Sequence, residues 1–186
     1  MDAFLVVDMQ VGLLAGAPKH DLQGVIGRIN LLAAQVREGA GKVVWIQHAG
    51  PAGDDFAPGR PGWALLPDLI RAGTDAIVPK TLNDAFAGTG LQALLAALAP
   101  ERLLIAGWAT DFCVDSTVRS AVSHGHAVTV VGDGHTLNDR PHLAAPAVIG
   151  HHNWVWSRLI SNRSIRVAST AELLADTPEN SAASPR

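Results

Sequence analysis

Residues 102–114 read RLLIAGWATDFCV, and this stretch decides the fold. The apolar run over 102–106 is typical of a buried strand, Gly107 favours a turn, and a helical pattern starts at Val114. A strand that turns directly into a helix lifts the residues between them to the carboxyl end of a sheet. The stretch therefore predicts an α/β fold with Cys113, the one cysteine of the chain, at that edge of the sheet.

The rest of the chain repeats this alternation of strand and helix. Helical stripes such as Val25, Ile29, Leu32 and Val36 separate six strand-like runs, at 3–7, 42–47, 76–78, 102–106, 127–131 and 165–167. Near-continuous apolar strands that alternate with helices are typical of a parallel sheet covered on both faces. Eight βα units do not fit into 186 residues, which argues against a closed barrel. We therefore predict an open, doubly wound, Rossmann-like α/β fold with a six-stranded parallel sheet.

Size and composition indicate one domain over residues 1–174 and a small, polar tail over 175–186 that we expect to be disordered. The 48% hydrophobic and 17% charged fractions are those of a globular enzyme, and the net charge of −3 favours neither nucleic acid nor a membrane surface as partner. One cysteine allows no internal disulfide, and no segment resembles a signal peptide or a membrane helix of ~20 residues. We expect a cytoplasmic protein.

Three residues that could carry chemistry follow strands of the predicted sheet. Asp8 ends the run 3–7, Lys80 follows the strand 76–78, and Cys113 follows 102–106. Each has a plainer interpretation, because Asp often caps turns, Lys is usually solvated and a free Cys usually packs. Together at one edge they would form a base, a cation and a nucleophile. The lysine and the helix N-terminus are expected to hold the thiol partly as thiolate, so that it reacts well below the usual thiol pKa of ~8.5.

Four segments, taken in order over residues 3–168, resemble the isochorismatase-like cysteine hydrolases, which include nicotinamidases and related amidohydrolases. They are LVVDMQVGLL (5–14), PK with DAFAGTGL (79–80 and 84–91), AGWATDFCV (106–114) and GDGHT (132–136). The resemblance implies a catalytic triad of Asp8, Lys80 and Cys113 and a cis peptide bond between Trp108 and Ala109. It also implies an oxyanion hole formed by the backbone N–H groups of Ala109 and Cys113.

The activity that this resemblance implies is cysteine-dependent hydrolysis of a C–N, amide-type bond of a small molecule through a thioester, without a cofactor. A homo-oligomer, either a dimer or a tetramer, is expected. Two other interpretations stay open: a catalytically silent binding domain on the same fold, and a metal-assisted, nicotinamidase-like enzyme. A thiol redox sensor is weaker, because the chain has no resolving cysteine.

Metal-assisted members carry closely spaced Asp and His residues after the second strand, where this chain reads QHAGPAGDD (47–55). His48, Asp54 and Asp55 are too few for a convincing site, so we expect no metal, and the sequence leaves open whether they contribute to the pocket.

The expected walls of the substrate pocket are mainly aromatic: Leu13, Trp63, Phe86 and Trp108. Core packing is an equal alternative for Trp63 and Phe86. A further helix carries the pair His151 and His152 beside Trp154 and Trp156, which indicates helix packing or a subunit interface.

Overall fold

The computed structural model describes residues 1–176, so residues 177–186 of the predicted tail lie outside the described residues. The strands are β1 (Asp2–Val7), β2 (Lys42–His48), β3 (Ala76–Lys80), β4 (Arg102–Trp108), β5 (Val128–Thr136) and β6 (Ile165–Ala168). The helices are α1 (Val11–Leu14), α2 (Leu22–Glu38), α3 (Leu91–Leu98), α4 (Asp115–Ser123), α5 (Ala145–Trp156) and α6 (Thr170–Ala175). A 3₁₀ turn, η1 (Pro61–Trp63), and a π-helical turn, η2 (Thr110–Val114), complete the set.

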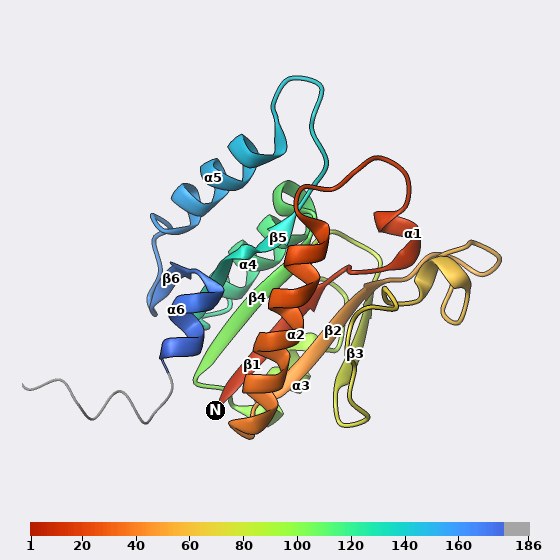
Figure 1. Ribbon diagram of the computed structural model, residues 1–186. Helices are drawn as coiled ribbons and strands as arrows, with labels where there is room; N and C mark the ends of the chain where they lie inside the picture. Colours follow the sequence, from red (N-terminus) through yellow and green to blue (C-terminus); the bar gives the residue numbers. More distant parts are fainter. Residues whose placement is uncertain (177–186) are drawn as a thin grey trace, which may run out of the picture.

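The six strands form one parallel sheet in the order β3-β2-β1-β4-β5-β6 (Figure 1). The chain moves outward from β1 to β3 in one direction and from β4 to β6 in the other, so the order reverses between β1 and β4. In open α/β sheets of this kind, ligands bind at the carboxyl ends of the strands beside such a reversal. The prediction of a doubly wound, six-stranded parallel sheet is confirmed.

Helices cover both faces of the sheet, with α2 and α6 in front of it and α3 and α4 behind it in Figure 1. Successive strand residues point to opposite faces. In β1, Leu5 and Val7 therefore pack into the core on the side of α3 and α4, while Phe4 and Val6 pack against α2. Within residues 1–176, no helix is long and apolar enough to cross a membrane.

The largest difference from the predicted elements is in β5, which continues to Thr136 instead of ending at Val131. Its second half is the GDGHT segment, whose glycines and charge hide the strand pattern, and its pairing with β4 shifts register between Ile105 and Gly107. The helices α1 and α6 were not predicted, because four and six residues are too few to show helical periodicity. A capping box between Ser169 and Glu172 starts α6.

Gly107 lets the chain turn from β4 toward Cys113. Its φ angle is 128°, a conformation that side chains rarely adopt, and a Cβ atom at this position would lie 2.1 Å from the carbonyl oxygen of Val7. Only glycine therefore allows β4 to lie this close to β1 at the reversal of strand order.

Candidate active site

Asp8, Lys80 and Cys113 meet at the carboxyl edge of the sheet. Oδ2 of Asp8 lies 2.6 Å from Nζ of Lys80, which in turn lies 3.4 Å from Sγ of Cys113. All three are buried, with exposed fractions of 0%, 2% and 7% respectively. The structure thus brings together the three residues that sequence reasoning singled out as base, cation and nucleophile.

The backbone of Asp8 turns its carboxylate toward the other two residues. Strict alternation along β1 would send this side chain to the face of α2, as it does for Val6. Instead, Asp8 has a φ of 53°, which ends the extended run, while its N–H donates to the carbonyl of Ile46 at 2.9 Å. Asp tolerates this left-handed conformation better than most residues, so this position suits an aspartate on backbone grounds as well.

The Asp8–Lys80 contact is a buried ion pair, and both carboxylate oxygens of Asp8 are buried. Hydrogen bonding from the side chains of Cys113 and Lys80 favours the charged form of this carboxylate. Nζ of Lys80 also donates to the carbonyl oxygen of Leu82 at 3.0 Å and to Sγ of Cys113 at 3.4 Å. A buried carboxylate with spare acceptor capacity is prepared to receive a proton.

Burial controls the protonation of this site. It raises the pKa of Asp8, and the nearby charge of Lys80 only partly opposes it. Burial, followed by the Asp8 carboxylate, raises the pKa of Cys113 to about 12, again against the influence of Lys80. The expectation of a partly ionised thiol is therefore wrong, because desolvation outweighs the lysine. At rest the site favours a neutral thiol beside the ion pair.

Asn83 is a neighbour of the thiol that sequence reasoning missed. Its Oδ1 lies 3.7 Å from Sγ of Cys113, within reach of a weak S–H donor. The side chain is exposed and follows Lys80 by three residues. Its place in the loop after a predicted strand was the one available signal.

The turn before the nucleophile has the expected backbone. The peptide bond between Trp108 and Ala109 is cis, as the resemblance implies. The carbonyl of Ala109 accepts from the N–H groups of Phe112 and Val114, both at 3.1 Å, and so closes the π-helical turn η2 around Cys113. Within residues 1–176, the Ala109 N–H donates to no backbone acceptor. This buried donor and the N–H of Cys113 belong to the same turn.

A second polar network links η2 to the rest of the fold. Sequence reasoning did not predict this network. Oγ1 of Thr110 lies 2.9 Å from Nδ1 of His135, whose Nε2 lies 3.0 Å from Oδ1 of Asn153. Burial lowers the pKa of His135 to about 4, so the ring is neutral near pH 7. The network ties η2 to β5 and α5. Its three members are far apart in the chain, so no spacing pattern reveals them.

The residues expected to line the pocket differ in their positions. Leu13, Trp63 and Trp108 are partly buried. The carbonyl of Trp63 accepts from the side chains of Gln10 and Gln47, which fixes η1 near the ends of β1 and β2. Phe86 is instead a core residue, 6% exposed and stacked on His124 with ring centroids 4.8 Å apart. The packing alternative therefore holds for Phe86.

The residues after β2 do not fit a nicotinamidase-type metal site. Asp54 uses Oδ1 to accept from the N–H of Phe56 at 2.7 Å, within the loop. No group of three His, Cys, Asp or Glu side chains in residues 1–176 is arranged to hold a metal ion. The ring of His48 lies edge-on to the ring of Phe56, with the two ring centroids 5.8 Å apart.

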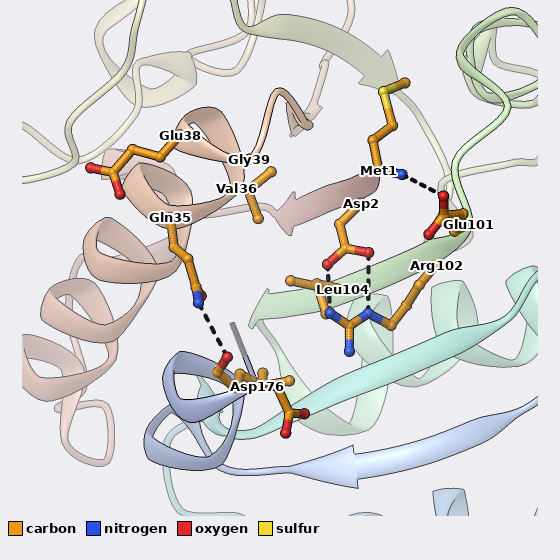
Figure 2. Close-up of a pocket in the computed structure, with 11 residues that line it drawn as sticks. Met1, Asp2, Gln35, Val36, Glu38, Gly39, Glu101, Arg102, Leu104 and Asp176 are labelled. Carbon is orange, nitrogen blue, oxygen red and sulfur yellow. Dashed lines mark hydrogen bonds and ion pairs between the residues drawn. The ribbon is translucent and has the colours of Figure 1, made fainter. Parts of the chain in front are cut away.

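A cavity of about 570 Å³ lies at the opposite, amino edge of the sheet (Figure 2). Two ion pairs lie along its wall: the amino group of Met1 with Glu101, and Asp2 with Arg102. None of the residues that line it contacts Asp8, Lys80 or Cys113 in an ion pair or hydrogen bond. The buried ionisable groups at the carboxyl edge are the stronger indication of a functional site, because perturbed pKa values gather at such sites.

Comparisons with known proteins agree with this geometry. The family model of the isochorismatase domain matches residues 2–150. A solved structure of an isochorismatase family protein superposes with a TM-score of 0.81 at 30% identity and covers 90% of this chain and 98% of its own. The sheet and the comparisons define a hydrolase domain with a Rossmann-like α/β fold, which carries a thiol at the carboxyl edge of the sheet. The chain belongs to the isochorismatase family.

Two relatives that are named for their activities are similar to this chain. A streptothricin hydrolase of Streptomyces noursei is 36% identical over 149 residues, which are 80% of this chain and 53% of that protein. The ureidoacrylate amidohydrolase RutB of Enterobacter sp. (strain 638) is 27% identical over 181 residues, covering 77% of this chain and 76% of that protein. The chain thus spans little more than half the length of the streptothricin hydrolases it matches.

Proposed function

We propose that this protein is an enzyme that hydrolyses a C–N, amide-type bond of a small molecule through a thioester on Cys113. The observation that carries the proposal is the buried Asp8–Lys80 ion pair beside the one thiol of the chain. Relatives named as a hydrolase of streptothricin and as an amidohydrolase support the same bond type. The substrate is a small-molecule amide.

Acylation begins with proton transfer from Cys113 to Asp8. The thiol is neutral at rest, and burial makes the Asp8 carboxylate more basic than a solvated one, so the proton moves as sulfur attacks the carbonyl carbon. Lys80 contacts both groups and remains paired with negative charge, first on oxygen and then on sulfur.

The tetrahedral intermediate needs donors for its oxyanion, and the N–H groups of Ala109 and Cys113 are our candidates. Asp8 then gives its proton to the leaving nitrogen, the C–N bond breaks and the thioester remains. Water completes the reaction by releasing a carboxylic acid and the free thiol. These steps require no cofactor or metal.

The test is turnover of a panel of small primary and secondary amides, with detection of released ammonia or amine. We expect the wild type to turn over at least one member and Cys113→Ala to lose at least about a thousandfold. An unchanged urea midpoint for the variant shows that the fold survives. If Cys113→Ala kept the wild-type rate, the thiol could not be the nucleophile. A silent binding domain would bind panel members without turnover.

Asp8→Asn and Lys80→Ala test whether the three residues act as one unit. Each single variant is expected to lose about as much activity as Cys113→Ala, because members of one catalytic unit are strongly non-additive. The rates of the singles and of the triple variant are compared with the same amide. A triple variant far slower than every single one would show independent contributions.

A further inference from the structure

The strands that carry Asp8 and Lys80 are not neighbours in the sheet, because a third strand lies between them. In the sheet order, β2 lies between β1, which precedes Asp8, and β3, which ends in Lys80. The last residue of β2 is His48, and it pairs in register with Lys80. His48 therefore sits at the carboxyl edge between the two charged partners.

The face of the sheet to which His48 belongs follows from alternation along β2. Val44 and Ile46 pack in the core cluster that includes Cys113, and His48 is the next residue on that side. When protonated, the imidazole of His48 acts on Asp8 and lowers the pKa of that carboxyl group, which places the two side chains near each other. The imidazole therefore shares a face with the thiol and lies near the carboxylate.

The backbone of His48 is held firmly, while its ring remains available. Its N–H donates to Oε1 of Gln10 at 2.7 Å and its carbonyl accepts from Nε2 of the same side chain at 3.0 Å. The ring packs edge-on against Phe56. Within residues 1–176, the hydrogen bonds of His48 all use its backbone, so both ring nitrogens are left to bind water or substrate.

Access to water distinguishes His48 from Asp8. The Asp8 side chain is 1% exposed and is in contact with Lys80, so it is well placed to exchange a proton with the adjacent thiol. Water that attacks a thioester must arrive from solvent, and His48 is partly exposed. Imidazole is the side chain best suited to accept a proton near neutral pH.

We infer that His48 is the base for deacylation, an inference that rests on the proposed cysteine hydrolase. One ring nitrogen takes a proton from water while the water oxygen bonds to the thioester carbonyl carbon. The C–S bond then breaks, and sulfur leaves with the electron pair. The imidazolium returns its proton to sulfur, directly or through Asp8, which restores the neutral thiol and releases the acid.

The experiment uses p-nitrophenyl acetate, an activated acyl donor whose use does not depend on knowing the natural amide. Release of p-nitrophenolate is followed by stopped flow for the wild type and His48→Gln. We expect the burst rate to stay within about threefold, because acylation uses Asp8. The steady-state rate should fall about a hundredfold or more, because general-base catalysis contributes at least that much. Intact mass should then show one acetyl group accumulating on Cys113 of the variant.

Several controls keep the outcomes distinct. The burst amplitude counts competent sites per chain, so it separates a folded variant from a misfolded one, and His48→Asn is the second variant. His126→Gln, which changes a histidine stacked on Phe86, should behave as the wild type. Equal loss of burst and steady-state rates, or no loss of either, would overturn the role of His48. A burst that persists in Cys113→Ala would instead overturn the proposed function.

Discussion

Cys113 illustrates how a single residue depends on its surroundings. A thiol at a helix N-terminus beside a lysine is usually expected to ionise readily. Here burial is the largest influence on the thiol and the Asp8 carboxylate acts in the same direction, so the pKa of Cys113 rises to about 12. In the proposed mechanism, the nucleophile is therefore generated by proton transfer to Asp8 during the reaction rather than held as a thiolate at rest.

This residue-scale view predicts the pH dependence of alkylation. Because thiolate is the reactive form, the rate of iodoacetamide reaction should be slow at pH 7 and rise about tenfold per pH unit through pH 9. Asp8→Asn removes a charge that raises the pKa of Cys113, so it should react faster at each pH. A wild-type rate that levels off near pH 7 would show a thiolate at rest.

His135 gives a second residue-scale prediction, on stability. Its folded-state pKa of about 4 lies below the unfolded value of ~6.5, so the unfolded chain takes up the proton first as pH falls. The neutral ring makes its full contribution to the free energy of unfolding above pH 6.5. This contribution, on the order of 3 kcal/mol, is lost as the pH falls from 6.5 to 4.

Urea unfolding at several pH values measures this loss. His135→Gln should be less stable at pH 7, because the ring bonds both Thr110 and Asn153, but its stability should fall less steeply between pH 6.5 and 4. Parallel curves for the two proteins would show that His135 does not titrate in this window.

At the scale of elements, the turn from β4 into η2 depends on a glycine at position 107, where a side chain would have no space. Gly107→Ala would force a Cβ against the carbonyl of Val7 in a left-handed conformation. We expect a loss of at least about 2 kcal/mol of unfolding free energy, measured as a lower urea midpoint.

Gly150→Ala is the matched control for this change. Gly150 lies inside α5 with open space around its Cβ position, so alanine there should stabilise the protein by about 0.5–1 kcal/mol through helix propensity. Similar effects of the two substitutions would show that β4 does not need glycine at its end.

At the scale of the whole molecule, the alternation of strands and helices was readable because apolar periodicity is local. Asp8, Lys80 and Cys113 could be grouped because each follows a strand. The partnership of Thr110, His135 and Asn153 could not, since it depends on how β5 and α5 pack. The thiol pKa could not be predicted either, because desolvation depends on the whole enclosure and not on neighbours in sequence.

The expected homo-oligomer is a prediction at this scale too. On α5, Trp156 is a core residue whose Nε1 donates to Asp115, whereas Trp154 is 62% exposed. If α5 forms a subunit interface, light scattering should give a dimer or tetramer and Trp154→Glu should shift it toward monomer. Trp154→Phe should keep the assembly. A wild-type monomer at high concentration would contradict this expectation.

The central claim is that an acyl group passes through Cys113. The most direct measurement is rapid quenching of the wild type with an amide that it turns over, followed by intact and peptide mass spectrometry. We predict an adduct with the mass of the acyl part, confined to the peptide that contains Cys113 and lost on longer incubation as the acid appears. Turnover without any adduct in the wild type or in His48→Gln, under conditions that preserve thioesters, would contradict the account.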